Sequence, residues 1–332
     1  MMAQHGAKQH LRQHWITSMS LESTKLFHGL FAFEYNNGCP REVVILTQRF
    51  ARNIFRASEL FTQRALQSLG AGVALGTIYM NISGGSRMAT EADRLGFFAF
   101  TLTFLFSSTM EALPIFLRER DIVEMESRRG AYRVCSYVMA NVFVFLPFLL
   151  LLAMLYAMGA YWLVGVKGPM PLTRDPEAFG FFVLVLWLAL TLANSFLSFV
   201  VTLVPDYIVG NSIIATCFGF FFLFSGYFIS LSNMPTYWRF MHYISLFKYP
   251  LDALLVNEFG SSSDGETRCF ATSNYGSNSF CILSGENILT ELGLQYTSKW
   301  QSVSVMISFA CLYRFLGYFM LLLKVWRATT KS

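Results

Sequence analysis

Few residues of this chain have the types and spacing that catalysis needs. No G-x-x-x-x-G-K-[ST] phosphate loop, no H-E-x-x-H and no G-x-S-x-G occurs in the 332 residues. We therefore expect neither nucleotide hydrolysis nor intramembrane enzyme activity from this chain alone. His5, His10 and His14 could in principle bind a metal, but they have no cysteine or carboxylate partners at ligand spacing. We interpret them as solvated side chains and predict no metal site.

Two ionisable residues lie inside long apolar stretches and need partners. Glu111 comes late in one stretch, and Arg314 lies midway along another. Charged groups at membrane depth usually face the interior of a helix bundle and pair there. One hypothesis is a mutual salt bridge between Glu111 and Arg314, with a structural rather than a catalytic role.

Six long apolar stretches must position such residues. A helix needs about 20 predominantly apolar residues to cross a membrane once, and these stretches are long enough for that. They cover residues 66–82, 95–117, 134–164, 179–204, 207–230 and 300–323. Hydrophobic residues make up 54% of the chain and charged residues 14%, whereas a soluble domain has roughly 25% charged residues. Because a barrel would show short alternating strands instead, the sequence predicts an all-α membrane protein with six transmembrane helices.

The basic residues indicate how the spans are oriented. With a cytoplasmic N-terminus, thirteen Lys and Arg residues flank the inner side and four lie in the two short outer loops, as the positive-inside rule requires. The inner residues are Arg41, Arg49, Arg52, Arg56, Arg64, Arg118, Arg120, Arg128, Arg129, Arg133, Lys324, Arg327 and Lys331, and the outer ones are Arg87, Arg94, Lys167 and Arg174. Both termini are then cytosolic. No basic stripe stands apart from the spans, so we expect no nucleic-acid partner.

Two further segments precede and interrupt the spans of the six-helix domain, 61–332. Residues 1–40 are polar, without an apolar signal segment, and we expect a mostly disordered cytosolic leader. In 41–60, apolar residues recur on one helical face and arginines on another, which predicts an amphipathic helix at the inner surface. Lipid headgroups and a cytosolic partner explain that helix equally well. Residues 118–133 are dense in both signs of charge and favour a short helix, with a solvated loop as the alternative.

The predicted outer loop, 231–299, combines aromatic and polar segments. Residues 235–258 are too short and too interrupted for two crossings, so we expect re-entrant or interfacial helices with aromatics at headgroup level. Cys269 and Cys281 would lie outside, where disulfides persist, and we predict that they pair with each other. The sequon Asn81-Ile82-Ser83 also falls on the predicted outer side, but its closeness to the bilayer leaves its glycosylation open.

Several ordered motifs resemble those of one family. The first runs from Glu111-Ala112-Leu113-Pro114-Ile115-Phe116-Leu117-Arg118-Glu119-Arg120 through Gly130-Ala131-Tyr132-Arg133 to Pro147. The second is Phe224-Ser225-Gly226-Tyr227-Phe228-Ile229, followed by Pro235, Tyr237-Trp238, Lys248-Tyr249 and Asn257-Glu258-Phe259. With Trp300 and Tyr313-Arg314, these motifs are similar over about residues 41–326 to the transmembrane domain of ABCG (White/brown) half-transporters, especially plant members, of the ATP-binding-cassette class.

This resemblance implies a membrane domain of ABC-2 exporter type that dimerises, with itself or another half-transporter, around a cavity for lipophilic substrates such as lipids, sterols or hydrophobic metabolites. Helix 41–60 would be the connecting helix, and the plasma membrane the expected location. The resemblance assigns Glu119, Arg120 and Glu126 to coupling with an ATPase, Phe100, Thr103, Phe104, Asn211, Thr216, Phe218 and Phe222 to substrate contact, and Tyr227 and Phe228 to an outer plug.

The sequence departs from this family in one respect. Family members carry an ATPase domain before the membrane domain, so ATP and Mg²⁺ would act here on a missing or partner ATPase domain. The chain is then either truncated, which we favour, or an orphan membrane subunit. The leading hypothesis is export coupled to ATP hydrolysis, and the alternative is a non-transporting subunit that dimerises with full-length half-transporters and regulates them. A passive channel would need polar rings along a pore, whereas these spans are rich in Phe and Leu.

Overall fold

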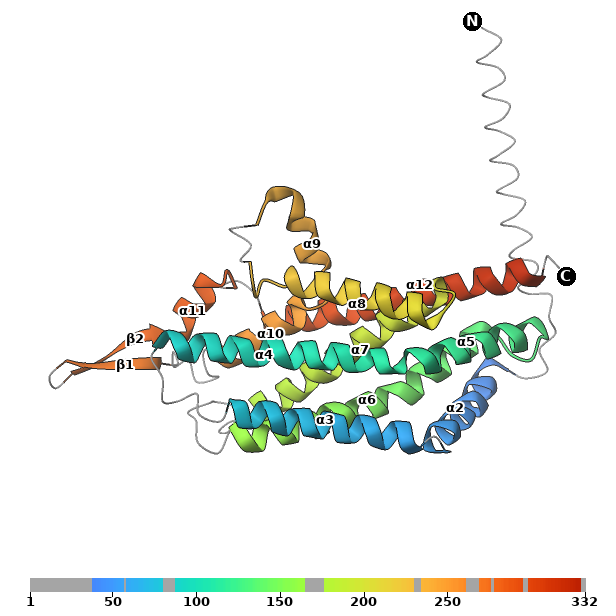
Figure 1. Cartoon of the computed structure of the whole chain (residues 1–332), viewed down its shortest axis with the longest axis horizontal. Helices are drawn as coiled ribbons and strands as arrows, with labels where there is room; N and C mark the ends of the chain where they lie inside the picture. Colours follow the sequence, from blue (N-terminus) through green and yellow to red (C-terminus); the bar gives the residue numbers. More distant parts are fainter. Residues whose placement is uncertain are drawn as a thin grey trace, which may run out of the picture.

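The computed structural model describes residues 38–56, 58–79, 87–164, 176–229, 234–260, 269–275, 278–294 and 298–329. In chain order its elements are α2 (Cys39–Arg56), α3 (Ser58–Ile78), α4 (Arg87–Thr109), η2 (Met110–Ala112), α5 (Leu113–Arg128), α6 (Val134–Val164), α7 (Pro176–Leu203), α8 (Tyr207–Leu223), η5 (Thr236–Trp238), α9 (Arg239–Ile244), α10 (Lys248–Phe259), β1 (Cys269–Tyr275), β2 (Asn278–Ser284), α11 (Gly285–Glu291) and α12 (Lys299–Thr329). Figure 1 shows the long helices side by side along the longest axis. We call the end with β1, β2 and α11 the hairpin end, and the opposite end, with α2 and the last turns of α5 and α12, the charged end.

Each predicted span contains a helix: in order, α3, α4 with the start of α5, α6, α7, α8 and α12. Among the described residues, four helices are long and apolar enough to cross a membrane, and a fifth apolar helix is shorter. The four are Asp93–Arg128, Val134–Ala160, Glu177–Leu203 and Lys299–Arg327, and the shorter one is Tyr207–Leu223. The helical membrane class is thus confirmed, whereas the number of six crossings stays a prediction.

Pro114 explains a break inside the second predicted span, 95–117. Proline lacks the N–H that would bond to the carbonyl four residues earlier, but it is well tolerated in the first turn of a helix. The chain accordingly forms the 3₁₀ turn η2 after α4, and Pro114 lies in the first turn of α5. The charged segment that follows is helical, as expected, but it is a continuation of this helix rather than a separate short one.

The turn from α5 to α6 depends on Gly130. Its φ of 69° lies in the left-handed region, which glycine enters without steric cost. The N–H of Gly130 donates to the carbonyl of Ser127, and the N–H of Ala131 donates to that of Glu126, at 3.0 and 3.2 Å. These two bonds form a Schellman motif, which satisfies the last carbonyls of α5 and reverses the chain into α6.

The segment 235–258 forms short helices, η5, α9 and α10, as expected for a loop that does not cross the membrane twice. Eight residues of α10 are buried, namely Pro250, Leu251, Asp252, Ala253, Leu254, Leu255, Glu258 and Phe259. The helix contacts α4, α7 and α12, so it is part of the bundle. Whether it is re-entrant in a membrane stays a prediction.

A two-stranded antiparallel hairpin, β1 and β2, follows α10 and was not predicted from the sequence. Its register places Cys281 opposite Thr272 and Cys269 opposite Ser284. The two cysteines therefore lie on neighbouring strands, and their disulfide stays a prediction. Residues 1–37 of the predicted leader and Asn81 of the sequon lie outside the described residues.

The core lies where phenylalanine rings of α4, α7 and α8 meet the start of α10. Phe106 of α4 stacks on Phe247, with ring centroids 4.2 Å apart, and also contacts Phe218 of α8 edge-on at 5.3 Å. Phe196 of α7 lies 5.7 Å from Phe218. Such ring pairs bury large apolar areas and prefer offset or edge-on geometry, so they fix α8 against α4 and α7.

Candidate coupling and substrate-contact sites

The predicted connecting helix corresponds to α2, which is attached at the charged end by apolar and charged contacts. Leu46 and Phe50 are buried in a cluster with Val123 of α5 and Tyr137 of α6. The guanidinium of Arg49 donates two hydrogen bonds to Glu126 of α5, at 3.1 and 2.9 Å. This bidentate bond raises the pKa of Arg49. Both polar and apolar faces of α2 therefore contact the helices that follow it.

The three predicted coupling residues each join α5 to a different helix. Glu126 binds α2, and Glu119 accepts a hydrogen bond from the Tyr137 hydroxyl of α6 at 3.4 Å. Arg120 donates to the carbonyl oxygens at the end of α7, those of Val201 at 2.9 Å, Val204 and Pro205. The last carbonyls of a helix lack intrahelical donors and attract cations. A displacement of α5 would thus be transmitted to α2, α6 and α7.

We expect the pair between Arg49 and Glu126 to hold α2 in place while adding little to global stability. It is partly exposed, and such pairs contribute about 0.2–1 kcal/mol. Glu126→Ala should therefore raise the rate of limited trypsin cleavage at Arg52 roughly two- to fivefold by favouring local opening of α2. Mass spectrometry of the fragments measures that rate.

Two variants control this experiment. Glu286→Ala removes an exposed carboxylate of α11 at the other end and should leave the cleavage rate unchanged. The swapped pair, Arg49→Glu with Glu126→Arg, should restore slow cleavage. Equal cleavage of the single and swapped variants would mean that the ion pair does not hold α2.

The predicted substrate contacts on α4 face different surroundings. Phe100 is 52% exposed. Thr103 is partly buried, and its hydroxyl donates to the Ala99 carbonyl at 2.8 Å. Phe104 stacks on Tyr156 of α6, with centroids 6.0 Å apart. Of the three, Phe100 is the residue most open to a ligand.

The predicted substrate contacts on α8 also differ in their exposure. Thr216 is exposed and Asn211 partly so, whereas Phe218 is 6% exposed and packs in the core. Phe222 is partly buried and stacks on Tyr227 at 5.9 Å. The structure therefore does not gather all seven predicted contacts on one surface, and their roles stay predictions.

The predicted plug residues form an aromatic group directly after α8. Tyr227 and Phe228 contact each other edge-on at 4.8 Å, and Phe222 contacts Phe228 at 5.2 Å. Gly226, with a φ of 98°, provides the turn that places them beyond the last residue of α8. Phe228 is 58% exposed, so this group is open on one side in the single chain.

The exposed surfaces of α4 and α8 each carry polar groups within predicted spans. On α4 and the turn after it, Phe100, Ser107 and Glu111 are exposed at near-helical spacing. On α8, Ser212 and Thr216 are exposed one turn apart. A carboxylate such as Glu111 is costly against lipid and usually faces protein or a water-filled cavity. The exposed surface of α4 near Glu111 is therefore poorly suited to lipid, whereas α8 also exposes apolar Ile213 and Phe220.

The proposed salt bridge between Glu111 and Arg314 is wrong. Arg314 of α12 donates to Asn141 of α6 at 2.7 Å and to Ser195 of α7 at 3.2 Å. Glu111 instead accepts a bond from Gln67 of α3 at 2.6 Å. Neutral amide and hydroxyl groups thus satisfy Arg314, and they join three helices around it.

Comparison with known proteins identifies the class of this bundle. A family model for the ABC-2 type transporter matches residues 41–259, which include most of α2, the charged part of α5 and the segment through α10. The chain belongs to the ABC-2 type transporter family. It is similar to ABC transporter G family member 5 of Arabidopsis thaliana, 47% identical over 88% of this chain and 42% of that protein. It is also similar to members 23 and 8 of the same plant, at 42% and 40% identity over 87% and 92% of this chain.

The matched region is a transporter's membrane domain, so this ABC-2 chain belongs in a membrane. It spans about half the length of the curated relatives it matches, covering 44% and 50% of members 23 and 8. The resemblance found in the motifs is thereby confirmed at the level of the family.

One charged pair of this ABC-2 domain was not predicted as a site. Arg94 of α4 and Glu258 of α10 are 2.8 Å apart, and their side chains are 2% and 0% exposed. From the sequence, Arg94 is predicted only as an outer-loop cation, and Glu258 only as part of a motif. The residues are far apart in sequence, and no local spacing signals such a pair.

Proposed function

We propose that this domain dimerises, with a second copy or with another ABCG-type half-transporter, around a cavity between the exposed faces of α4 and α8. ATPase domains that bind ATP and Mg²⁺ would act on α2 and α5 and drive export of lipophilic molecules. The domain would lie in the plasma membrane with both termini in the cytosol.

The exposed residues of α4 and its following turn (Phe100, Ser107 and Glu111) and of α8 (Ser212 and Thr216) carry this proposal. A second domain against these helices would remove Glu111 from lipid and leave hydroxyls and aromatic rings along a shared space. Aromatic walls with few fixed polar groups suit apolar and chemically varied ligands. The similar relatives are named as ABC transporters, which supports ATP-driven movement.

The contacts of α5 support the coupling role. Glu119, Arg120 and Glu126 bind three different helices, so a push on α5 would move the bundle rather than a loose loop. Because α5 continues from α4 through η2, the same movement would reach Phe100 and Phe104.

Flux measurements test this proposal. The full chain is co-expressed with Arabidopsis ABC transporter G family member 5, and ATP-dependent uptake of a fluorescent fatty acid is measured in inside-out vesicles. We expect flux per copy of the relative to rise with the chain. Phe100→Ala in the chain should lower the gain about tenfold, since a buried Phe contact contributes about 1.5–3 kcal/mol. Phe315→Ala, an exposed ring of α12 outside the proposed cavity, is the matched control.

The opposite result would favour the regulatory alternative. A chain that lowers the relative's flux, with the same effect for Phe100→Ala and Phe315→Ala, would act as a non-transporting subunit. Unchanged flux together with no co-purification of the relative would contradict dimerisation with that relative.

A further inference from the structure

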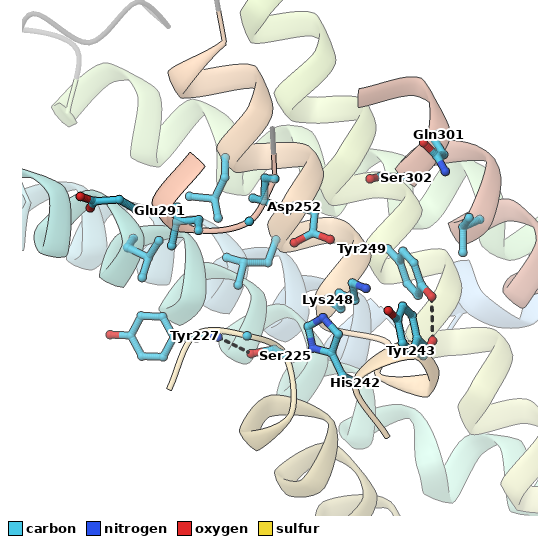
Figure 2. Close-up of a pocket in the computed structure, with 18 of the residues that line it drawn as sticks. Ser225, Tyr227, His242, Tyr243, Lys248, Tyr249, Asp252, Glu291, Gln301 and Ser302 are labelled. Carbon is cyan, nitrogen blue, oxygen red and sulfur yellow. Dashed lines mark hydrogen bonds between the residues drawn. The ribbon is translucent and has the colours of Figure 1, made fainter. Parts of the chain in front are cut away.

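A pocket of about 770 Å³ lies at the hairpin end, between α9, α10, the end of α11, the first turns of α12 and Leu95 of α4. Figure 2 shows side chains of α9 and α10 facing it together. Leu95, Leu251 and Leu255 contribute apolar wall, and His242, Lys248 and Asp252 contribute polar groups. Of the site residues predicted from the sequence, Tyr227 lines this pocket.

Asp252 is the unusual group in the pocket wall. It is 7% exposed, yet it has no hydrogen bond and no ion pair within 4 Å among the described residues. A buried carboxylate is costly unless a partner compensates for its lost hydration. Burial raises the pKa of Asp252 to about 7, although the charge of Lys248 opposes this rise. The side chain is thus a buried acceptor that faces an open space without a partner.

Lys248 lies one helical turn before Asp252 and faces the same pocket (Figure 2). Its ammonium lies over the ring of Tyr243, 4.3 Å from the centroid, and 5.5 Å from the centroid of Tyr249. It forms no ion pair with Asp252 within 4 Å, so a ligand can reach each charge separately. Arg239 and Glu291, which are exposed, repeat the same two signs at the rim.

We propose that this pocket binds a zwitterionic headgroup, with the ligand's ammonium on Asp252 and its anionic group on Lys248. A purely anionic ligand would be repelled by Asp252 and Glu291, and a purely cationic one by Lys248 and Arg239. A ligand that carries both charges complements both pairs.

The surroundings indicate a lipid as the source of this headgroup. Tyr237 and Trp300 are 73% and 59% exposed at the same end, and such aromatics mark the membrane interface. The leucines of the pocket wall can hold the first part of an acyl chain beside the charged groups. A phospholipid with a primary amine, phosphatidylethanolamine, fits both features.

Native mass spectrometry of the full chain in detergent tests the proposal directly. Dioleoyl phosphatidylethanolamine, dioleoyl phosphatidylglycerol and diolein are titrated separately, and bound lipid is counted. We expect the ethanolamine lipid to bind most tightly. Asp252→Asn and Lys248→Met should each weaken its binding about tenfold or more. Asp206→Asn, an exposed aspartate in the turn between α7 and α8, is the control and should bind like the native chain.

Each outcome decides the matter. Equal binding of phosphatidylglycerol would overturn the proposal in favour of an anion site, and equal binding of diolein in favour of a hydroxyl site. Unchanged binding in both pocket variants would place the lipid elsewhere. If soluble phosphoethanolamine displaced the lipid at a concentration similar to that of the lipid, the site would still bind a zwitterionic group. Its ligand would then be a free metabolite rather than a lipid. The assay needs neither ATP nor a partner, so a failure of the transport proposal does not affect it.

Discussion

Glu258→Ala is expected to destabilise the domain by about 3–5 kcal/mol, because it leaves the guanidinium of Arg94 buried without its carboxylate. Both side chains are almost completely inaccessible, and their 2.8 Å contact joins α10 to α4. The apparent unfolding temperature in detergent, measured by loss of the monodisperse peak on size exclusion, should fall on the order of 10 °C. Glu286→Ala, an exposed glutamate at the same end, should change it little.

A double variant distinguishes the cost of burying one unpaired charge from the net contribution of the ion pair to stability. Arg94→Met with Glu258→Leu removes both charges and fills similar volume, and apolar replacements of buried pairs are often neutral or stabilising. We therefore expect the double variant to unfold at a higher temperature than Glu258→Ala. If Glu258→Ala were as stable as the native chain, α10 would not depend on this ion pair for its position.

The helices could be predicted because a bilayer requires long apolar segments that satisfy their own backbone hydrogen bonds. α6 runs from Val134 to Val164, the same range as its predicted span. α8 ends earlier than expected, at Leu223, because Ser225 and Gly226 form a turn with a φ of 98° at the glycine. The residue types at this turn were the signal for the shorter helix.

The contacts between helices could not be predicted in the same way. Large apolar residues lie all around α8, so its sequence does not indicate which of them face the core. Phe218, a ligand contact by prediction, instead packs against Phe106 and Phe196. The sequence favours a pair between Arg314 and the other membrane charge, because it does not show that Asn141 and Ser195 lie beside Arg314. The sequence alone predicts that Glu119, Arg120 and Glu126 lie on one helix. The helix that each of them contacts can be seen only in the structure.

Gly72→Ala is the second substitution from which we expect a large effect. It should lower the stability of the domain, although helix propensity alone would favour alanine. Alanine stabilises a helix interior by about 1 kcal/mol relative to glycine. At Gly72 of α3, however, a Cβ would lie 2.5 Å from the carbonyl oxygen of Tyr156 and 3.2 Å from the amide nitrogen of Ala160, both backbone atoms of α6. Small residues allow this close approach of membrane helices. We expect a loss of about 1–3 kcal/mol, typical of overpacking.

Gly70→Ala provides the matched control on the same helix, because nothing lies within 4 Å of a Cβ there. Its unfolding temperature should stay the same or rise, whereas that of Gly72→Ala should fall. The difference between two identical substitutions two residues apart isolates the contact with α6, since helix propensity contributes equally to both. Gly159 of α6 meets α3 from the other side, with Leu69 O and Val73 N each 3.1 Å from its Cβ position, so Gly159→Ala should resemble Gly72→Ala. Equal stability of the Gly70 and Gly72 variants would mean that α3 moves away from α6 at little cost.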